Sequence, residues 1–142
     1  MYGVHGKGEM ERLRGDMSGN LVESQVHPMQ REVVQFQEHI GTPPEKVYAK
    51  FKEEAIETIL EKEKSGFSEE MAMEACDTII VALGLIHLAG QDFQELFEKK
   101  MAINRRKYAL MPVYLAQGDS YEIAAARCKD LWSLHKEKET QK

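Results

Sequence analysis

An apolar run with one acidic residue inside it and another just before it constrains the fold of this chain more than any other feature. The run spans Cys76–Ile86 and includes Asp77, with Glu74 three residues earlier. Residues three apart share a helix face, so both carboxylates are expected on a face that continues through apolar Val81 and Leu85. Buried carboxylates are costly unless a cation or hydrogen-bond donors neutralise them. The pattern therefore predicts a buried helix whose acids require a cation.

A second predicted helix carries Glu53, Glu54 and Glu57, again at helical spacing. Two helices that each offer paired acids can converge on one cluster of oxygen ligands, which suits a hard divalent cation such as Mg²⁺. The alternative for each of these glutamates is a solvated helix face paired with nearby lysines. The alternative for Glu74 and Asp77 is a pair of acids at a helix start.

Basic residues crowd the fourth predicted helix, where Lys100, Asn104 and Lys107 lie on roughly one face. Such a set is suited to phosphate oxygens whose charge the metal does not cover. The alternative is the ordinary preference for cations at a helix C-terminus.

Apolar periodicity and helix-end signals predict an all-α fold of about five helices with no strands. The expected helices cover residues 29–39, 44–64, 69–89 and 93–108, and a last one begins at Asp119 or Ser120; Pro112 is expected to break the chain before it. Residues 1–27 are expected to form a partly irregular N-terminal arm, with a short helical turn near residues 10–13. Residues 28–110 then form a helical domain, and 111–142 form a C-terminal helix and charged tail.

The third predicted helix is apolar on nearly all sides between Ile79 and Leu88. A helix of this kind is either central in a large bundle or buried between subunits. Because a chain of 142 residues is short, we expect burial between subunits, in a homodimer or homotetramer.

Composition argues against several functional classes. The net charge of −5 gives no basic stripe for nucleic acid or a membrane surface. No stretch reaches 18 consecutive apolar residues, so no membrane span is expected, and the N-terminus has no apolar signal segment. Cys76 and Cys128 form neither a metal spacing nor a disulfide framework, which favours a reducing cytoplasm.

The acidic and basic motifs together resemble those of the MazG-like all-α nucleoside triphosphate pyrophosphohydrolases, which include dCTP pyrophosphatases and dimeric dUTPases. The resemblance covers about residues 29–110 and is closest to phage or single-domain members. It implies a Mg²⁺-dependent enzyme, with Mn²⁺ as a possible substitute, that converts a nucleoside triphosphate to the monophosphate and pyrophosphate. The implied substrate is a deoxynucleotide, with dATP and dGTP among the options. The rival interpretation is an inactive helical module for oligomerisation or regulation.

The resemblance also implies roles for individual residues. Glu54, Glu57, Glu74 and Asp77 would bind the metal, Lys100, Asn104 and Lys107 would bind phosphate, and Glu53 would be a further ligand or would orient water with Glu54. Phe36 and Gln37 are candidates for stacking on and hydrogen-bonding a base; the alternative for Phe36 is an ordinary core position.

Overall fold

The computed structural model describes residues 26–141, so most of the expected arm at residues 1–27, including the turn near 10–13, lies outside the described part. The chain divides into two compact units, with the boundary between Glu95 and Leu96. Within residues 26–141 every regular element is a helix, which confirms the predicted all-α class.

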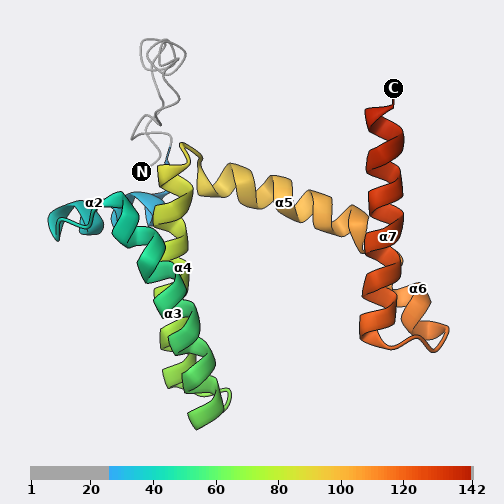
Figure 1. The fold of residues 1–142 in the computed structure, drawn as a ribbon, viewed down its shortest axis with the longest axis horizontal. Helices are drawn as coiled ribbons and strands as arrows, with labels where there is room; N and C mark the ends of the chain where they lie inside the picture. The colour runs from blue at the N-terminus through green and yellow to red at the C-terminus, as the bar shows by residue number, and fades with distance from the viewer. Residues whose placement is uncertain (1–25, 142) are drawn as a thin grey trace, which may run out of the picture. The chain divides into compact units, whose positions relative to one another are not determined.

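The first unit is built on a helical hairpin. Helices α3 (Pro44–Ser65) and α4 (Glu69–Leu88) lie side by side, and α2 (Pro28–His39) packs against α4 (Figure 1). Helix α5 (Phe93–Lys107) begins in this unit and continues into the second. These bounds agree with the predicted helices to within two residues.

Local signals set the ends of the hairpin helices. Gly66 ends α3 with a φ of 69°, a left-handed conformation that favours glycine, and its N–H donates to the Lys62 carbonyl at 2.8 Å. The Ser68 hydroxyl then caps α4 by accepting from the N–H of Met71 at 3.1 Å. The short turn between them makes α3 and α4 antiparallel neighbours.

A buried glutamine ties α2 to the start of α5. The Gln30 side chain is fully buried; it donates to the Gln91 carbonyl at 2.9 Å and accepts from the N–H of Phe93 at 2.8 Å. Nearby, Asp92 accepts from the N–H groups of His27 at 2.8 Å and Glu95 at 3.0 Å. Both buried side chains are therefore satisfied by backbone groups, and together they join the start of α2 to the α4–α5 loop and the start of α5.

The second unit contains the rest of α5, a short helix α6 (Met111–Ala116) and α7 (Tyr121–Thr140). Its small core consists of Tyr114, Ala124 and Cys128. Helix α6 was not predicted, since Pro112 was expected to break the chain. The prediction was wrong because Pro112 lies in the first turn of α6, where a missing N–H costs no helical hydrogen bond.

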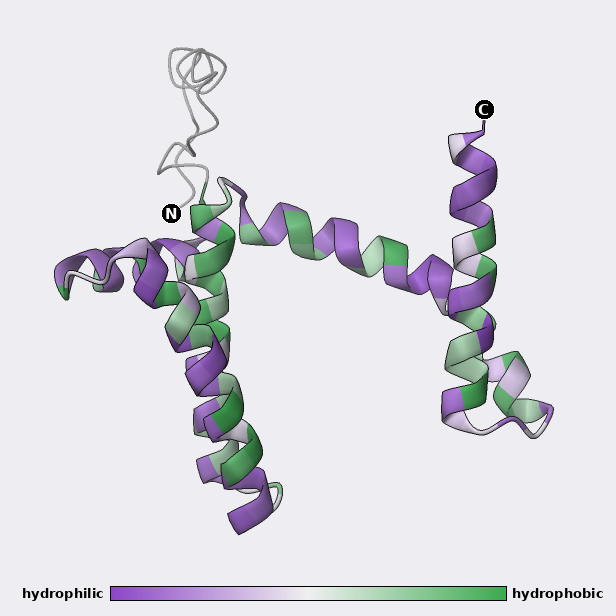
Figure 2. Ribbon diagram, viewed as in Figure 1, coloured by the Kyte–Doolittle hydropathy of each residue, from purple (hydrophilic) through white to green (hydrophobic). Residues whose placement is uncertain are grey.

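Helix α4 is less buried than the sequence predicts. Asp77 is exposed, and the side chain of Ile79 is 52% exposed, because α2 and α3 cover only part of the α4 surface. Figure 2 shows hydrophobic residues along much of α4. The expectation that Asp77 is buried is thus wrong for the chain taken alone.

Helix α4 is also long and apolar enough, by length and composition, to cross a membrane. It carries Glu74 and Asp77, and carboxylates at membrane depth are costly. A core helix of a soluble protein can have this length and composition but is mostly buried, whereas 17% of the apolar window of α4 is buried among the described residues, where α4 packs against two other helices of the first unit.

Candidate metal and nucleotide site

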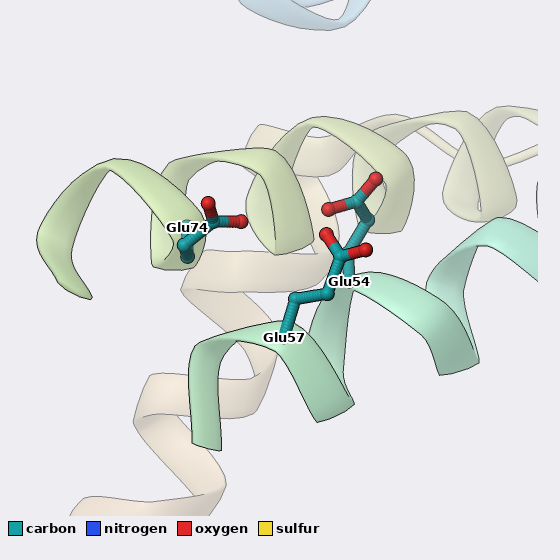
Figure 3. Close-up of side chains that lie close together, drawn as sticks. All are labelled: Glu54, Glu57 and Glu74. Atoms are coloured by element: carbon teal, nitrogen blue, oxygen red, sulfur yellow. The ribbon is translucent and has the colours of Figure 1, made fainter. Parts of the chain in front are cut away.

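Three of the predicted ligands lie together between α3 and α4. Glu54 and Glu57 come from α3 and Glu74 from α4, and their side chains gather between the two helices (Figure 3). One carboxylate oxygen from each lies within 4.8 Å of the others. The predicted convergence of acids from two helices is therefore present for these three residues.

A pair of threonines lies one turn beyond the acids. The hydroxyl oxygens of Thr58 on α3 and Thr78 on α4 are 3.1 Å apart. The Thr58 hydroxyl also lies 2.9 Å from the carbonyl oxygen of Glu54, and the Thr78 hydroxyl lies 3.3 Å from that of Glu74. Two hydroxyl protons can serve only two of these three contacts at once. The Thr58–Thr78 contact thus joins α3 and α4 close to the carboxylates.

Glu54 is the most buried of these three glutamates, with 9% of its surface exposed. Burial raises the pKa of its carboxyl above the ordinary value, and the neighbouring Glu57 carboxyl raises it further through hydrogen bonding and charge. The buried Oε2 atom of Glu54 has no hydrogen-bond partner in the structure. A buried carboxylate with an unsatisfied oxygen, beside two further acids, has the chemistry of a cation ligand.

A cavity of about 660 Å³ opens beside these acids. Its size falls in the range of small-molecule sites, roughly 300–1,000 Å³. Glu53, Glu54 and Asp77 line it, although Asp77 does not belong to the three-carboxylate group. The charge of Asp77 nevertheless contributes to the raised pKa of Glu54, so the two carboxylates are electrostatically coupled.

The predicted base-binding residues line the same cavity. Phe36 is 56% exposed, so the alternative of an ordinary core position does not hold within this chain. Gln37 packs on the backbone of α4 at Gly84, where an added Cβ would lie 2.6 Å from both the Nε2 and Oε1 atoms of Gln37. Gly84 thus makes room for the Gln37 amide, and both residues also line a second cavity of about 200 Å³.

The predicted phosphate-binding residues belong to a different part of the chain. Lys100, Asn104 and Lys107 lie on the section of α5 that belongs to the second unit. The Nζ atom of Lys107 lies 5.3 Å from the centre of the Tyr108 ring. Their partnership with the acids of the first unit stays a prediction.

Comparison with known families identifies the chain. The family model described as phosphoribosyl-ATP pyrophosphohydrolase matches residues 21–104, more than half of the sequence and all of the acid-bearing hairpin. The chain belongs to the phosphoribosyl-ATP pyrophosphohydrolase family. No curated protein and no solved structure gives a significant match.

This family is part of the MazG-like all-α superfamily, so the resemblance seen in the motifs is confirmed. Membership in the phosphoribosyl-ATP pyrophosphohydrolase family supports a nucleotide pyrophosphohydrolase activity in general, which is hydrolysis of a phosphoric anhydride. Glu54, Glu57 and Glu74 fit a divalent cation, because they supply hard oxygen atoms and one of these is buried without a partner.

Sequence reasoning missed three residues near the acids, namely Thr58, Thr78 and Lys46, whereas Lys50 was expected among the lysines that pair with the glutamates of α3 and forms such pairs with Glu53 and Glu54. Each threonine follows a cluster glutamate by four residues, which is a signal that the sequence contains. The two lysines precede the acids on the same helix and line the cavity.

Proposed function

We propose that this pyrophosphohydrolase is Mg²⁺-dependent and converts a deoxynucleoside triphosphate to the monophosphate and pyrophosphate. The observation that carries the proposal is the convergence of Glu54, Glu57 and Glu74 around a buried oxygen without a partner, beside a cavity of nucleotide size. Asp77 on the rim of that cavity would complete the ligand set.

When bound, Mg²⁺ would neutralise phosphate charge and make a nearby water more acidic. The contribution of the chain is to position the reacting groups. Glu53 lines the cavity and would orient the attacking water and accept its proton, either alone or with Glu54. The oxygen of that water bonds to the α-phosphorus, the bond from that phosphorus to the bridging oxygen breaks, and pyrophosphate leaves.

The remaining phosphate charge needs donors from the chain. Lys100, Asn104 and Lys107 carry the motif predicted for this role, and charge-assisted hydrogen bonds to phosphate are among the strongest that side chains make. At the other end of the substrate, Phe36 would stack on the base and the Gln37 amide would hydrogen-bond its edge.

Two substrate classes compete for this cavity. Deoxynucleotides, including dATP and dGTP, are the expectation from the motif resemblance, whereas the matched family is described by phosphoribosyl-ATP. We favour deoxynucleotides because, among the described residues, the basic side chains that line the cavity are Lys46 and Lys50, and the phosphate of a phosphoribosyl group would need further cations of its own.

A substrate panel tests the proposed function. Purified protein with Mg²⁺ is incubated with each standard dNTP and NTP and with phosphoribosyl-ATP, and products are separated by chromatography. We expect a monophosphate and pyrophosphate from a deoxynucleotide. Release of orthophosphate and a diphosphate would refute attack at the α-phosphorus, and no turnover of any compound would favour an inactive regulatory module.

We also propose that the enzyme is a homodimer or homotetramer. Apolar side chains more than half exposed line the hairpin, namely Ile56, Ile59 and Leu60 on α3 and Met73 and Ile79 on α4. Leaving such a patch in water would offset much of the stability of a small domain, and two-fold pairing is the commonest way to cover it. Sedimentation at low micromolar concentration tests this, and a folded, active species of 16.3 kDa would refute it.

The cytoplasm is the location we propose. Cys76 and Cys128 are both free thiols, and Cys76 is exposed. Free exposed thiols persist most readily in a reducing compartment. Fractionation of cells that express the protein would test the location, and recovery with the membrane fraction would contradict it.

A further inference from the structure

Lys50 occupies the position from which a cation can reach two of the acids. It lies on α3 one turn before Glu54, and its Nζ atom is 3.4 Å from Glu53 Oε2 and 3.5 Å from Glu54 Oε1. Its side chain is about half exposed, and it lines the cavity that Phe36 and Gln37 also line. The ammonium group therefore lies beside two of the acids, and Lys50 lines the cavity proposed for a nucleotide.

Carboxylates outnumber ammonium groups in the lining of the cavity. Three carboxylates line it, from Glu53, Glu54 and Asp77, against the two ammonium groups of Lys46 and Lys50. Among the described residues, Glu53 and Glu54 both form their ion pairs with Lys50. Lys50 is thus the cation that partly balances the buried carboxylate of Glu54 when no metal ion does so.

A divalent cation on the carboxylates would change the surroundings of Lys50. The metal and the ammonium group would then compete for the same carboxylate charge and repel each other. Because the Lys50 side chain is flexible and about half exposed, its ammonium group can move away from the carboxylates with little loss of free energy. The phosphates of a bound nucleotide, in the cavity that Lys50 lines, are the nearest anions that could accept it.

We propose that Lys50 is an exchangeable counter-ion that pairs with Glu53 and Glu54 in the metal-free enzyme and moves to the substrate phosphates when the metal binds. This proposal rests on the proposed function of the acid cluster. It makes Lys50 a positioning residue that couples occupancy of the metal site to nucleotide binding. An ordinary surface pair between residues three and four apart would produce no such coupling.

The test compares Lys50→Met with the wild-type enzyme. Calorimetric titration with Mg²⁺ alone, without nucleotide, is expected to show about two- to fivefold tighter binding in Lys50→Met, because the competing cation is gone. Steady-state kinetics with the nucleotide identified by the substrate panel are expected to show KM raised about tenfold and kcat changed less, because a charged phosphate contact is lost. Lys50→Arg should restore both values toward wild type.

The matched control is Lys52→Met. Lys52 lies two residues away on α3, where its Nζ is 4.9 Å from the centre of the Tyr48 ring, and it does not line the cavity. Neither Mg²⁺ affinity nor KM should change in this variant. Unchanged or weaker Mg²⁺ binding in Lys50→Met, or an unchanged KM, would overturn the proposal for Lys50 while leaving the proposed function intact. A wild-type enzyme that neither binds Mg²⁺ nor hydrolyses any nucleotide would overturn both.

Discussion

Replacing Glu54 with glutamine should raise the stability of the metal-free protein and lower its turnover. The substitution keeps the size of the side chain but removes the negative charge of the carboxylate. Burial raises the pKa of this carboxyl, and its Oε2 atom has no hydrogen-bond partner. Glutamine keeps a polar atom at that buried position, so the expected gain comes from removing a buried charge beside Glu57 and Asp77, which costs about 1–3 kcal/mol. Because Lys50 already offsets part of that cost, we expect metal-free Glu54→Gln to be more stable than wild type by about 1 kcal/mol, or about 3 °C in Tm.

Mg²⁺ should reverse the order of stability of the two proteins. Wild-type enzyme should gain about 2.7 kcal/mol when the free Mg²⁺ concentration is a hundred times Kd. Glu54→Gln should gain little, because a neutral amide is a weak ligand for Mg²⁺, and its turnover should fall by more than about a hundredfold. Thermal melts with Mg²⁺ and with a chelator measure both effects.

The pH dependence gives an independent check. A raised pKa in the folded state means that the native protein holds this proton more tightly than the unfolded chain. Stability of the metal-free enzyme should therefore fall as pH rises from the ordinary value of 4.5 through the raised pKa. Glu54→Gln should lack this contribution, whereas exposed Glu63→Gln should behave as wild type. If Glu54→Gln is less stable than wild type without metal, or keeps its turnover, the role given to Glu54 is wrong.

Three further substitutions test other parts of the site. Asp77→Asn should abolish turnover and leave the fold intact; near wild-type activity at saturating Mg²⁺ would remove Asp77 from the ligand set. Gln30→Ala should lower Tm by about 3–9 °C, because the buried N–H of Phe93 loses its acceptor, and an unchanged melt would contradict the role of this network. Gly84→Ala should change relative KM values across nucleotide bases more than Tm, because the new Cβ displaces the Gln37 amide; equal KM changes for all bases would count against base reading by Gln37.

The helices of this chain were predictable because their signals are local. The caps at Ser68 and Ser120, and the glycine at Gly66, determine where helices begin or end whatever packs around them. Helix α6 was missed because Pro112 was read only as a breaker, although proline is tolerated in a first helical turn.

The site was predictable in part, for a related reason. Helical spacing alone places Glu54 and Glu57 on one face, so their convergence with Glu74 follows once α3 and α4 form a hairpin. Burial is different, because it depends on which surfaces pack against a helix. Asp77 was therefore expected to be buried and is exposed within this chain. The contact between Thr58 and Thr78 was missed because it depends on the exact register of the two helices.

Isotope labelling tests the central claim most directly. The enzyme reacts with its nucleotide substrate and Mg²⁺ in water enriched in ¹⁸O. The ¹⁸O content of both products is measured by mass spectrometry after a single turnover. Attack on the α-phosphorus, in a site built from the acids of α3 and α4, predicts one ¹⁸O atom in the monophosphate and none in the pyrophosphate. Label in the pyrophosphate would place the attack on the β-phosphorus and contradict the account.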